Sequence, residues 1–599
     1  MSRESLRKEY TGDGEKFRKL EIRENRILLY LSFLRLLCFV GGLILIIYMV
    51  LRHSGPISLL VAFAVVIIFL FLLKLFSDHS VSREFYCNLA LINMNEAGAL
   101  SGDLSMFDPG RQYADSSHDF SYDVDLFGDN SLFQYLNRTV TGYGRDMLAG
   151  WLSDPYPLSG ELLKRQEIVR ELAARKRWRH EFMAEGMRVP LENATITDLV
   201  KWMEGTAFIE SSLTRKILIF LLPGVALLSL SLLIAGLLHY SVFVIAILIN
   251  LGYGSSGLKK TNEIHLALSG RYAYLSSMNR LLAIFNGEQF HSEYLNGMKY
   301  EISGPGVSAV VAVKKLSRLV QSFDSRMNII VGFGLNALLL WDFHCIQRLE
   351  RWKAEYKTRF PLWLDILGKI DAYSSLGNYA FNNPEYVYPV ISGYIFSAEM
   401  MGHPLIDESR RVCNDFHLGS RGTICIITGA NMAGKSTFLR TVAVNCILGM
   451  TGSPVCASQM EFTPSRLFTS MRTTDSLSGN ESYFYAELKR LKVMKDKIMD
   501  NEPVLFILDE ILKGTNSADK TLGSKLFLKK LIPLGGTGLI ATHDISLGEL
   551  EKEHPGNVFN MCFEIDIDGE SIRFDYKLNR GMTRKMNAAF LMKQMGILD

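Results

Sequence analysis

Long runs of apolar residues that carry no charge are the first pattern along this chain. Two of them, Leu36–Leu51 and Ile57–Leu73, are separated by only a short polar turn. Each run is slightly shorter than the roughly 20 residues that a membrane-spanning helix needs. The first run lengthens backward through Leu28–Leu34 if Arg35 extends its charged end out of the apolar layer. The pattern predicts a transmembrane hairpin over residues 28–76, with a hairpin buried in a soluble fold as the alternative.

A second apolar block, Ile217–Leu258, contains no Asp, Glu, Lys or Arg. Its main polar interruption is His239-Tyr240-Ser241, near the middle, where a tight turn between two spans is expected. Basic pairs flank the block at Arg215-Lys216 and Lys259-Lys260, and the positive-inside rule puts such flanks in the cytoplasm. The two hairpins predict four spans and an integral, multi-pass protein of a bacterial inner membrane. Its spans contact membrane lipid, and its other domains lie in the cytosol.

The remaining segments are shorter, polar or amphipathic. A third apolar stretch, Met327–Trp341, contains two Asn and is predicted to be a buried helix. Ser101–Asn130 carries seven Asp and little apolar periodicity, which predicts a solvated linker. The predicted organisation is a cytosolic tail (1–27), the first hairpin (28–76), a linker (77–125), core helices (126–216), the second hairpin (217–258), returning helices (259–385) and a C-terminal domain (386–599).

Composition narrows the function only slightly. The formal net charge of +3 is close to balance, so it gives no support for a strong electrostatic grip on DNA. The eight cysteines form no C-x-x-C pair, which argues against a zinc site and against a disulfide framework. Reduced cytosolic thiols are the expected state. The N-terminal tail is too charged for a cleaved signal peptide.

Candidate chemistry begins at Thr428–Thr437, which reads T-G-A-N-M-A-G-K-S-T and contains G-x-x-x-x-G-K-[ST]. A short apolar run, Ile424–Ile427, precedes the motif, and a helical pattern, Phe438–Leu448, follows it. In that strand–loop–helix context, glycines let the backbone wrap around phosphate oxygens, and the helix N-terminus supplies N–H groups. A chance Gly-rich turn is the alternative. The motif predicts a nucleotide site in which Lys435 reaches the β- and γ-phosphates, Ser436 ligates Mg²⁺, and the other binding residues are Gly429, Asn431, Gly434 and Thr437.

Two later strands end in residues that such a loop needs. Val504–Glu510 reads V-L-F-I-L-D-E, a buried parallel strand that ends in two carboxylates. Open α/β sheets bind ligands at this strand edge, so Asp509 is predicted to support Mg²⁺ from just outside its direct ligands. Glu510 is predicted to act as the base or to position water for attack on the γ-phosphate. A third strand, Gly538–Thr542, ends in His543, which is predicted to sense the γ-phosphate or orient the water; a structural histidine is the alternative.

Together these motifs resemble the ATPase domain of the MutS family. The resemblance rests on the phosphate loop, on D-E-I-L-K-G-T-N from Asp509 to Asn516, and on A-T-H-D from Ala541 to Asp544. It implies an α/β P-loop ATPase domain that binds ATP and Mg²⁺ and forms a homodimer with composite sites. Asp475–Leu488 is similar to the family segment that reaches a neighbouring subunit. This likeness implies that Ser482 contacts the γ-phosphate in trans and that Glu487 occupies the family's acidic position.

The resemblance extends to an all-α core, or lever, domain. Leu126–Leu172 is similar to its start, where Thr-x-x-Gly-Arg precedes a long helix; Gly144-Arg145 and Trp151-Leu152 match, and the usual Pro before that Gly is missing. In the family a DNA-gripping clamp is inserted between outgoing and returning lever helices. Here the membrane hairpin 217–258 occupies that place. No mismatch-reading domain is expected in the first 80 residues, and no nuclease domain after the C-terminal β-hairpin and helix.

These observations predict a membrane-anchored, MutS-like ATPase coupled to DNA binding, although mismatch recognition by the usual mechanism is not expected. Two other functions stay open. One is an ATP-dependent membrane scaffold that binds an unidentified protein through its lever helices. The other is a transporter ATPase, because Leu477–Glu481 resembles the ABC signature L-S-G-G-Q, with its second Gly and its Gln absent.

Overall fold

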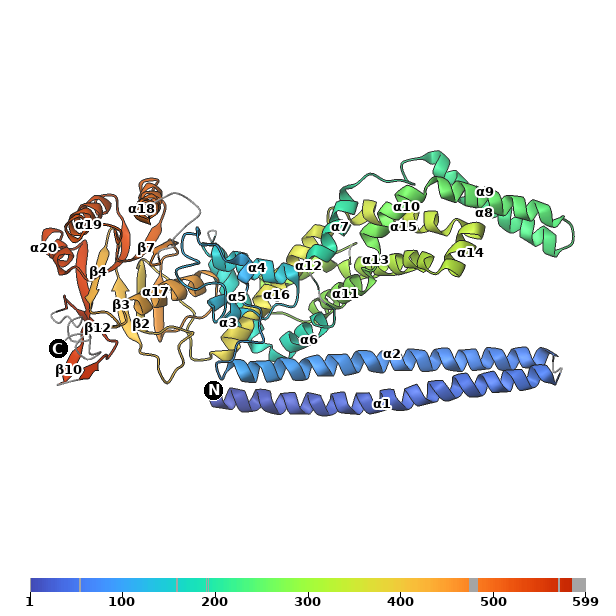
Figure 1. The fold of residues 1–599 in the computed structure, drawn as a ribbon, viewed down its shortest axis with the longest axis horizontal. Helices are drawn as coiled ribbons and strands as arrows, with labels where there is room; N and C mark the ends of the chain where they lie inside the picture. Colours follow the sequence, from blue (N-terminus) through green and yellow to red (C-terminus); the bar gives the residue numbers. More distant parts are fainter. Residues whose placement is uncertain are drawn as a thin grey trace.

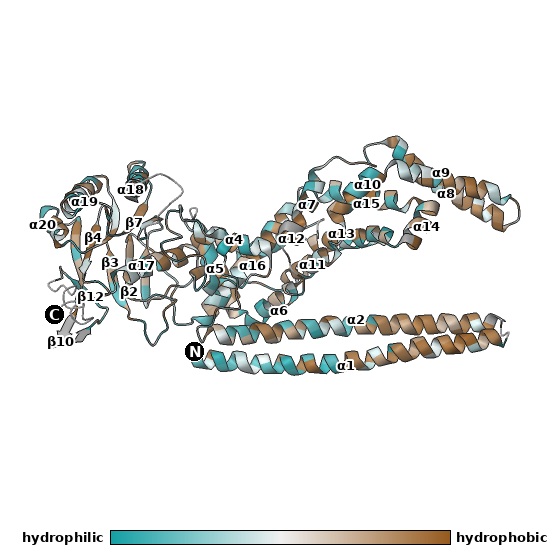
Figure 2. Cartoon of the chain, viewed as in Figure 1, coloured by the Kyte–Doolittle hydropathy of each residue, from teal (hydrophilic) through white to brown (hydrophobic). Residues whose placement is uncertain are grey.

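The structure is a computed structural model that describes residues 2–52, 55–157, 160–189, 191, 193–306, 308–472, 483–568 and 571–583. The molecule is elongated, with a β-sheet domain at one end and helices forming the rest (Figure 1). Both apolar hairpins extend away from the sheet domain and end at the opposite side of the molecule. Figure 2 shows that the most hydrophobic helical surface gathers at that far end.

The N-terminal hairpin consists of two very long helices, α1 (Arg3–Leu51) and α2 (Gly55–Ala99). Their polar halves pack on the lever helices, where Leu6 and Tyr10 are buried. Their apolar halves touch mainly each other, and in the most apolar window only 6% of α1 and 0% of α2 is buried. The helices approach closely at Gly42, where an added Cβ would lie 2.4 Å from the Val65 side chain.

The second apolar block forms α8 (Leu213–Ile234) and α9 (Tyr240–Ser256), and α9 bends by 64° into α10 (Leu258–Leu268). In the part of the chain that the structure describes, α1, α2 and α8 are each long and apolar enough to cross a membrane. Two bent pairs, α9–α10 and α14–α15, raise that number to five if each pair is one span. The four predicted spans therefore correspond to α1, α2, α8 and α9, and their membrane location is still a prediction.

The prediction of a buried helix over Met327–Trp341 is wrong in its burial. The helix exists as α14 (Ile329–Leu339), but Ile330 is 84% exposed and Phe333 is 63% exposed. The reason is its place at the far end of the lever, beside the α8–α9 hairpin, where no described element covers its outer face (Figure 1). Apolar composition predicted the helix, but composition does not show whether protein, lipid or water surrounds it.

The lever is a set of helices whose apolar faces share one core with part of the sheet domain. Its outgoing and returning helices are α3 (Leu132–Leu136), α4 (Gly142–Ser153), α5 (Glu161–Ala174), α6 (Lys176–Gly186), α7 (Asn193–Glu204), α11 (Tyr272–Gly287), α12 (Glu293–Ser303), α13 (Ala309–Asp324), α15 (Trp341–Tyr356) and α16 (Phe360–Asn382). The longest of these, α16, runs from the lever to the sheet domain and packs against α4 and α5.

The N-terminus of α4 is attached to α16 through Asp371. This carboxylate accepts hydrogen bonds from the Thr141 hydroxyl at 2.6 Å, from the Thr141 N–H at 2.8 Å and from the Val140 N–H at 3.0 Å. A Cβ at Gly144 would lie 2.2 Å from Asp371 Oδ2. The Gly in the Thr-x-x-Gly-Arg motif is therefore required by this close approach of helix and carboxylate.

A buried polar network joins the N-terminal hairpin to the same helix. Glu96 on α2 is 1% exposed, and it accepts from Arg138 Nε at 2.5 Å and from Asn382 Nδ2 at 2.8 Å. Asn382 Oδ1 in turn accepts from the Tyr10 hydroxyl of α1 at 2.7 Å. Both helices of the hairpin are thus fixed at the point where α16 enters the sheet domain.

The acid-rich segment, predicted to be a solvated linker, is instead packed against the sheet domain. Asp123 is 2% exposed and accepts from the Thr469 hydroxyl at 2.6 Å and from the Arg472 N–H at 2.8 Å. Asp125 pairs with Arg472 at 2.5 Å and with Arg440 at 3.3 Å. These aspartates thus bind arginine side chains, a hydroxyl and a backbone N–H of the sheet domain. The number of Asp residues in the segment could not indicate such contacts.

The main sheet of the C-terminal domain has the strand order β12-β9-β4-β8-β7-β6, parallel except for β12. Alternate residues of its central strands face opposite sides. One face packs on α17 (Lys435–Met450) and the lever core, and the other packs on α18 (Tyr483–Met499) and α19 (Ser517–Leu531). The strands are β4 (Ile424–Gly429), β6 (Arg466–Ser470), β7 (Val504–Asp509), β8 (Thr537–Thr542), β9 (Val558–Phe563) and β12 (Leu578–Arg580).

Two smaller sheets complete this domain. A four-stranded sheet contains β1 (Val390–Ile391), β5 (Gln459–Phe462), β2 (Phe396–Met401) and β3 (Asn414–Leu418). The predicted C-terminal hairpin pairs β10 (Asp566–Asp568) with β11 (Ser571–Arg573), and the predicted terminal helix lies outside the described residues. Because β4, β7 and β8 are parallel neighbours, their carboxyl ends meet at one edge of the main sheet.

Candidate functional site

The loop from Gly429 to Lys435 joins the end of β4 to the start of α17 at this edge. Gly434 has φ of 105° and Met432 has φ of 63°, so the loop turns through the left-handed region twice. The Lys435 side chain is buried beneath the loop, and its Nζ donates to the carbonyl oxygens of Gly429 at 2.8 Å and Ala430 at 2.9 Å. The loop thus curls around an ammonium group, with the N-terminus of α17 beside it.

Ser436 and Asp509 bring two oxygen atoms together beside this loop. Ser436 Oγ donates to Asp509 Oδ2 at 2.5 Å, across the neighbouring ends of α17 and β7. A hydroxyl and a carboxylate are oxygen ligands of the kind that Mg²⁺ prefers, with waters and substrate oxygens completing its octahedron. Among the residues that the structure describes, no group of three or more His, Cys, Asp or Glu could hold a metal by itself. The pair therefore fits Mg²⁺ that arrives with a phosphate.

Glu510 follows Asp509 with φ of 55°, which turns its side chain away from the strand direction. Its Oε1 lies 3.3 Å from His543 Nε2, and its Oε2 lies 3.5 Å from Lys520 Nζ. His543 Nε2 also lies 3.4 Å from Lys435 Nζ. Lys435, Glu510 and His543, which were predicted from separate segments, therefore meet in one cluster. Lys520 also belongs to this cluster, and no sequence motif had predicted it.

Burial sets the charge state of this cluster. It lowers the pKa of Lys435 to about 8, against the opposing effect of the Asp509 and Glu510 carboxylates. It also lowers the pKa of His543, and the nearby Lys435 charge acts in the same direction. At neutral pH the imidazole is thus neutral, and its Nε2 either accepts from Lys435 or donates to Glu510, but not both.

Glu487 on α18 fixes the backbone that follows Glu510. Its Oε1 accepts from the Leu512 N–H at 2.6 Å, and its Oε2 accepts from the Lys513 N–H at 3.1 Å. Leu512 has φ of 61°, so the turn is a tight one that needs outside support. Burial raises the pKa of Glu487, while the two N–H donors oppose that shift. The sequence indicated an acidic residue here only through a family likeness; its contacts come from the fold.

A cavity of about 370 Å³ opens beside Gly434 and Thr437. His403, Ile406, Phe438 and Tyr576 are among its lining residues, so it can take a flat, partly apolar group next to the loop. Sequence reasoning did not predict it, because its walls come from three separate parts of the chain. Asn431, Ser436 and Thr437 lie exposed on the loop side, whereas Ser482 lies outside the described residues.

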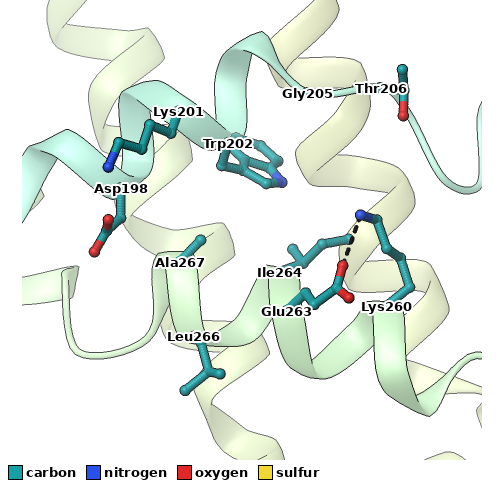
Figure 3. Close-up of a pocket in the computed structure, with 10 residues that line it drawn as sticks. All are labelled: Asp198, Lys201, Trp202, Gly205, Thr206, Lys260, Glu263, Ile264, Leu266 and Ala267. Carbon is teal, nitrogen blue, oxygen red and sulfur yellow. Dashed lines mark hydrogen bonds and ion pairs between the residues drawn. The ribbon is translucent and has the colours of Figure 1, made fainter.

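A larger cavity, of about 490 Å³, lies far from this edge, between α7 and α10 (Figure 3). Three of its four charged lining groups are already in ion pairs: Lys260 with Glu263 at 2.9 Å and Asp198 with Arg271 at 3.0 Å. No residue of the predicted site lines it. The candidate site is therefore the loop edge of the main sheet.

Comparison with known proteins finds similarity to proteins named MutS. Residues 425–594 match the sequence model of the family described as MutS domain V. A Finegoldia magna protein named DNA mismatch repair protein MutS is 34% identical over 41% of this chain and 29% of its own length. Proteins of the same name from Thermotoga maritima and Aquifex pyrophilus are 32% and 27% identical, over 39% and 76% of this chain. The chain spans only 29% and 56% of these two relatives.

Proposed function

Because this chain belongs to the MutS family, we propose that it is a membrane-anchored ATPase whose nucleotide state is coupled to DNA binding. The observation that carries the ATPase part is the Ser436–Asp509 oxygen pair, 2.5 Å apart, beside a loop that curls around Lys435. These groups are the ones that a Mg²⁺–triphosphate needs, and Glu510 stands next to them.

In this proposal each residue has a separate task. Lys435 exchanges its two carbonyl partners for β- and γ-phosphate oxygens, and loop N–H groups hold the remaining oxygens. Ser436 and Asp509 hold Mg²⁺, which neutralises phosphate charge when bound. Glu510 orients the attacking water. Neutral His543 forms a hydrogen bond with the γ-phosphate or with that water. Ser482 of a second copy completes the site, so the active form is a homodimer.

The cavity beside Gly434 takes the base of the nucleotide. It adjoins the loop at Thr437, and Phe438, Ile406 and Tyr576 supply apolar and aromatic walls. A purine buries well in a pocket of this kind, where stacking and apolar contact give affinity and a few polar groups give orientation. The loop and the cavity together account for a whole nucleoside triphosphate.

Membrane anchoring is the second part of the proposal. The exposed apolar halves of α1 and α2 and the α8–α9 hairpin lie at the end of the molecule opposite the sheet domain (Figures 1 and 2). Large exposed apolar surfaces of this kind call for a lipid or protein cover. With both hairpins in a bilayer, the lever and the sheet domain stand in the cytosol, where ATP is available.

DNA coupling is the third part, and its support is family membership together with names of relatives that contain DNA mismatch repair. The specific observation for the alternative, an ATP-dependent scaffold, is that the lever ends in the α8–α9 apolar hairpin, the place where the resemblance implies a DNA clamp. Transport of a solute is a weaker candidate, because Leu477–Glu481 lacks the second Gly and the Gln of the ABC signature that it resembles.

ATP hydrolysis by the detergent-solubilised full chain tests the first part. Lys435→Ala is expected to abolish binding of ATP, and Glu510→Gln to keep binding while slowing hydrolysis by about 100-fold or more. Lys530→Ala, on the exposed side of α19, is the matched control and leaves both unchanged. Hydrolysis by Glu510→Gln at the rate of the unchanged protein would contradict the assigned role.

Two further measurements test the other parts. Protein that resists extraction from membranes by alkaline carbonate supports the anchor, and protein released into the supernatant opposes it. DNA binding is measured with homoduplex, mismatched and branched DNA, as a function of salt and with ATP or ADP. Salt-sensitive binding that changes with nucleotide supports coupling. Its absence under all conditions favours the scaffold.

A further inference from the structure

A cavity of about 340 Å³ lies at the base of the α8–α9 hairpin, between α9, α10, α14 and α15. Its walls are mostly apolar, and they also contain several polar side chains that are shielded from solvent. Leu251, Phe333, Leu340 and Phe343 are among its apolar lining residues, and Asn250, Thr261, Arg326 and Asp342 are its notable polar ones. In the membrane-anchored arrangement proposed above, on which this inference rests, it lies near the level of lipid headgroups, because Lys259-Lys260 lie in the first turn of α10, just beyond the end of α9.

Three oxygen atoms of this lining have no hydrogen-bond partner among the described residues: Asn250 Oδ1, Thr261 Oγ1 and Asp342 Oδ1. Their residues are 0%, 1% and 7% exposed. Buried polar atoms without a partner cost free energy, so native structures nearly always satisfy them with protein, water or a ligand. These three atoms are therefore available as acceptors for a molecule that enters the cavity.

The other atoms of the same side chains are firmly held. Asn250 Nδ2 donates to the carbonyl oxygen of Ala337 at 2.9 Å, which attaches α9 to α14. Asp342 Oδ2 pairs with Arg326 Nε at 3.1 Å. The free oxygens thus have fixed positions. The one Arg and one Asp of the lining also balance in charge, which favours an occupant that is itself neutral overall.

The chemistry of the free atoms selects the kind of occupant. Two are pure acceptors, one of them on a carboxylate, and the third is a hydroxyl that can accept. A primary ammonium has three N–H donors and one positive charge, which matches this set. A trimethylammonium has no N–H donor, and an anion would face the Asp342 carboxylate. A phosphate attached to the ammonium would lie toward Arg326.

The surface next to the cavity suits acyl chains. On α14, Ile330 is 84% exposed and Phe333 is 63% exposed, and Phe333 also lines the cavity. We propose that this cavity binds the headgroup of a phospholipid that carries a primary ammonium, such as phosphatidylethanolamine, with its chains along α14. The site is distinct from the nucleotide site and joins the lever to the lipid around it.

Lipid retention tests the proposal on the full chain. The protein is reconstituted with equal amounts of phosphatidylethanolamine, phosphatidylcholine and phosphatidylglycerol, re-extracted in mild detergent, and its bound lipid is quantified by mass spectrometry. We expect phosphatidylethanolamine to be enriched. Asp342→Asn removes the charge-assisted contact and is expected to lower this enrichment by about ten-fold. Thr261→Val keeps side-chain shape and removes one acceptor, so a smaller loss is expected.

Controls separate the possible failures. Asp198→Asn, in the cavity of Figure 3, is matched in chemistry and should leave retention unchanged. Lys435→Ala should also leave it unchanged, so failure of the ATPase proposal does not affect this result. Equal retention of all three lipids, or retention insensitive to both Asp342→Asn and Thr261→Val, would mean that the cavity holds water only. Protein that resists carbonate but shows no preference overturns the lipid site and leaves the anchor; protein that carbonate releases overturns both.

Discussion

The Tyr10 hydroxyl donates a hydrogen bond to Asn382 Oδ1 at 2.7 Å, although 372 residues separate them in the sequence. Asn382 ends α16, the helix that enters the sheet domain, and Tyr10 belongs to the first helix of the chain. Asn382 also donates to Glu96 of α2, which pairs with Arg138. The apolar hairpin is therefore bonded directly to the entrance of the candidate ATPase domain, and a displacement of either one strains the same buried network.

Removal of one partner from this network should be costly. Arg138→Met leaves Glu96, which is 1% exposed, as an unpaired buried carboxylate, so the free energy of unfolding should fall by about 3–5 kcal/mol. Adding Glu96→Leu should restore most of that loss, because it removes the orphaned charge. Denaturant unfolding of the detergent-solubilised protein measures both. Arg177→Met, which breaks an ion pair of a 92% exposed arginine, is the control and should cost less than about 1 kcal/mol. A double variant as unstable as the single one would contradict this account.

Nucleotide affinity should fall as pH rises above 8. Burial lowers the pKa of Lys435 to about 8 in the empty site, so the ammonium is charged at pH 7 and mostly neutral at pH 9. A bound triphosphate requires the charged form, so binding above pH 8 takes up a proton. The dissociation constant of a non-hydrolysable ATP analogue should then rise by up to about ten-fold per pH unit. Titration calorimetry in buffers of different ionisation enthalpy measures this uptake directly.

Lys435→Arg provides the control for this pH dependence, because a guanidinium stays protonated throughout the range. Its affinity should vary little between pH 7 and pH 9.5, whatever its absolute value. An unchanged slope in this variant would show that another group is responsible.

Glu487→Gln should slow hydrolysis without weakening nucleotide binding. The amide keeps one acceptor oxygen, so the backbone N–H of either Leu512 or Lys513 loses its acceptor, and the turn after Glu510 loosens. Misplacing a water-orienting group by about 1 Å costs about 10–100-fold in kcat. Steady-state kinetics should show this fall with KM changed by no more than about two-fold. Glu502→Gln, which lies before β7 and pairs with Arg466, should alter neither. An equal loss of binding in Glu487→Gln would indicate general unfolding instead.

Gly144→Ala should destabilise the lever. The new Cβ would lie 2.2 Å from Asp371 Oδ2, so α4 must move away from α16 at a cost of about 1–3 kcal/mol. Gly150→Ala in the same helix has nothing within 4 Å of its added Cβ and should be neutral or slightly stabilising. Thermal unfolding of the two variants should move in opposite directions. A tolerated Gly144→Ala would show that the contact is not rigid.

The exposed side of α14 should face lipid. A nitroxide at Ile330 should collide freely with oxygen and poorly with a water-soluble nickel complex when the chain is in liposomes, because oxygen partitions into the bilayer. A nitroxide at Tyr300, which is 67% exposed on α12, should show the opposite preference. Equal exposure of both positions to the nickel complex would place α14 in water.

The sequence predicts those parts of the site that are local. The segment around Gly429–Ser436 is a strand–loop–helix on its own, and Asp509 and His543 each follow an apolar strand; the parallel order of β4, β8 and β7 then brings them together. Family membership was also predicted, and the comparisons confirm it. The roles of the site residues, including Ser482, stay predictions.

What the sequence could not predict depends on contacts between distant segments. Asp123 was interpreted as part of a solvated linker, since nothing nearby shows that Thr469 and Arg472 provide its donors. The helix over 329–339 was recognised from its apolar residues, but its exposure depends on its position at the end of the lever. Glu487 was recognised only as an acid, because the N–H groups that it binds lie in another strand connection.

Both apolar hairpins point away from the sheet domain in the same direction (Figure 1). If one bilayer holds both, rotation about the bilayer normal is the only freedom of orientation left to each copy. A two-fold axis that relates two such copies must then stand along that normal, because any other axis would place one sheet domain on the wrong side. Copies held in this way search for each other in two dimensions with their loop edges at one height, which raises their effective concentration. The hairpins would thus select the symmetry of the dimer before the two sheet domains touch.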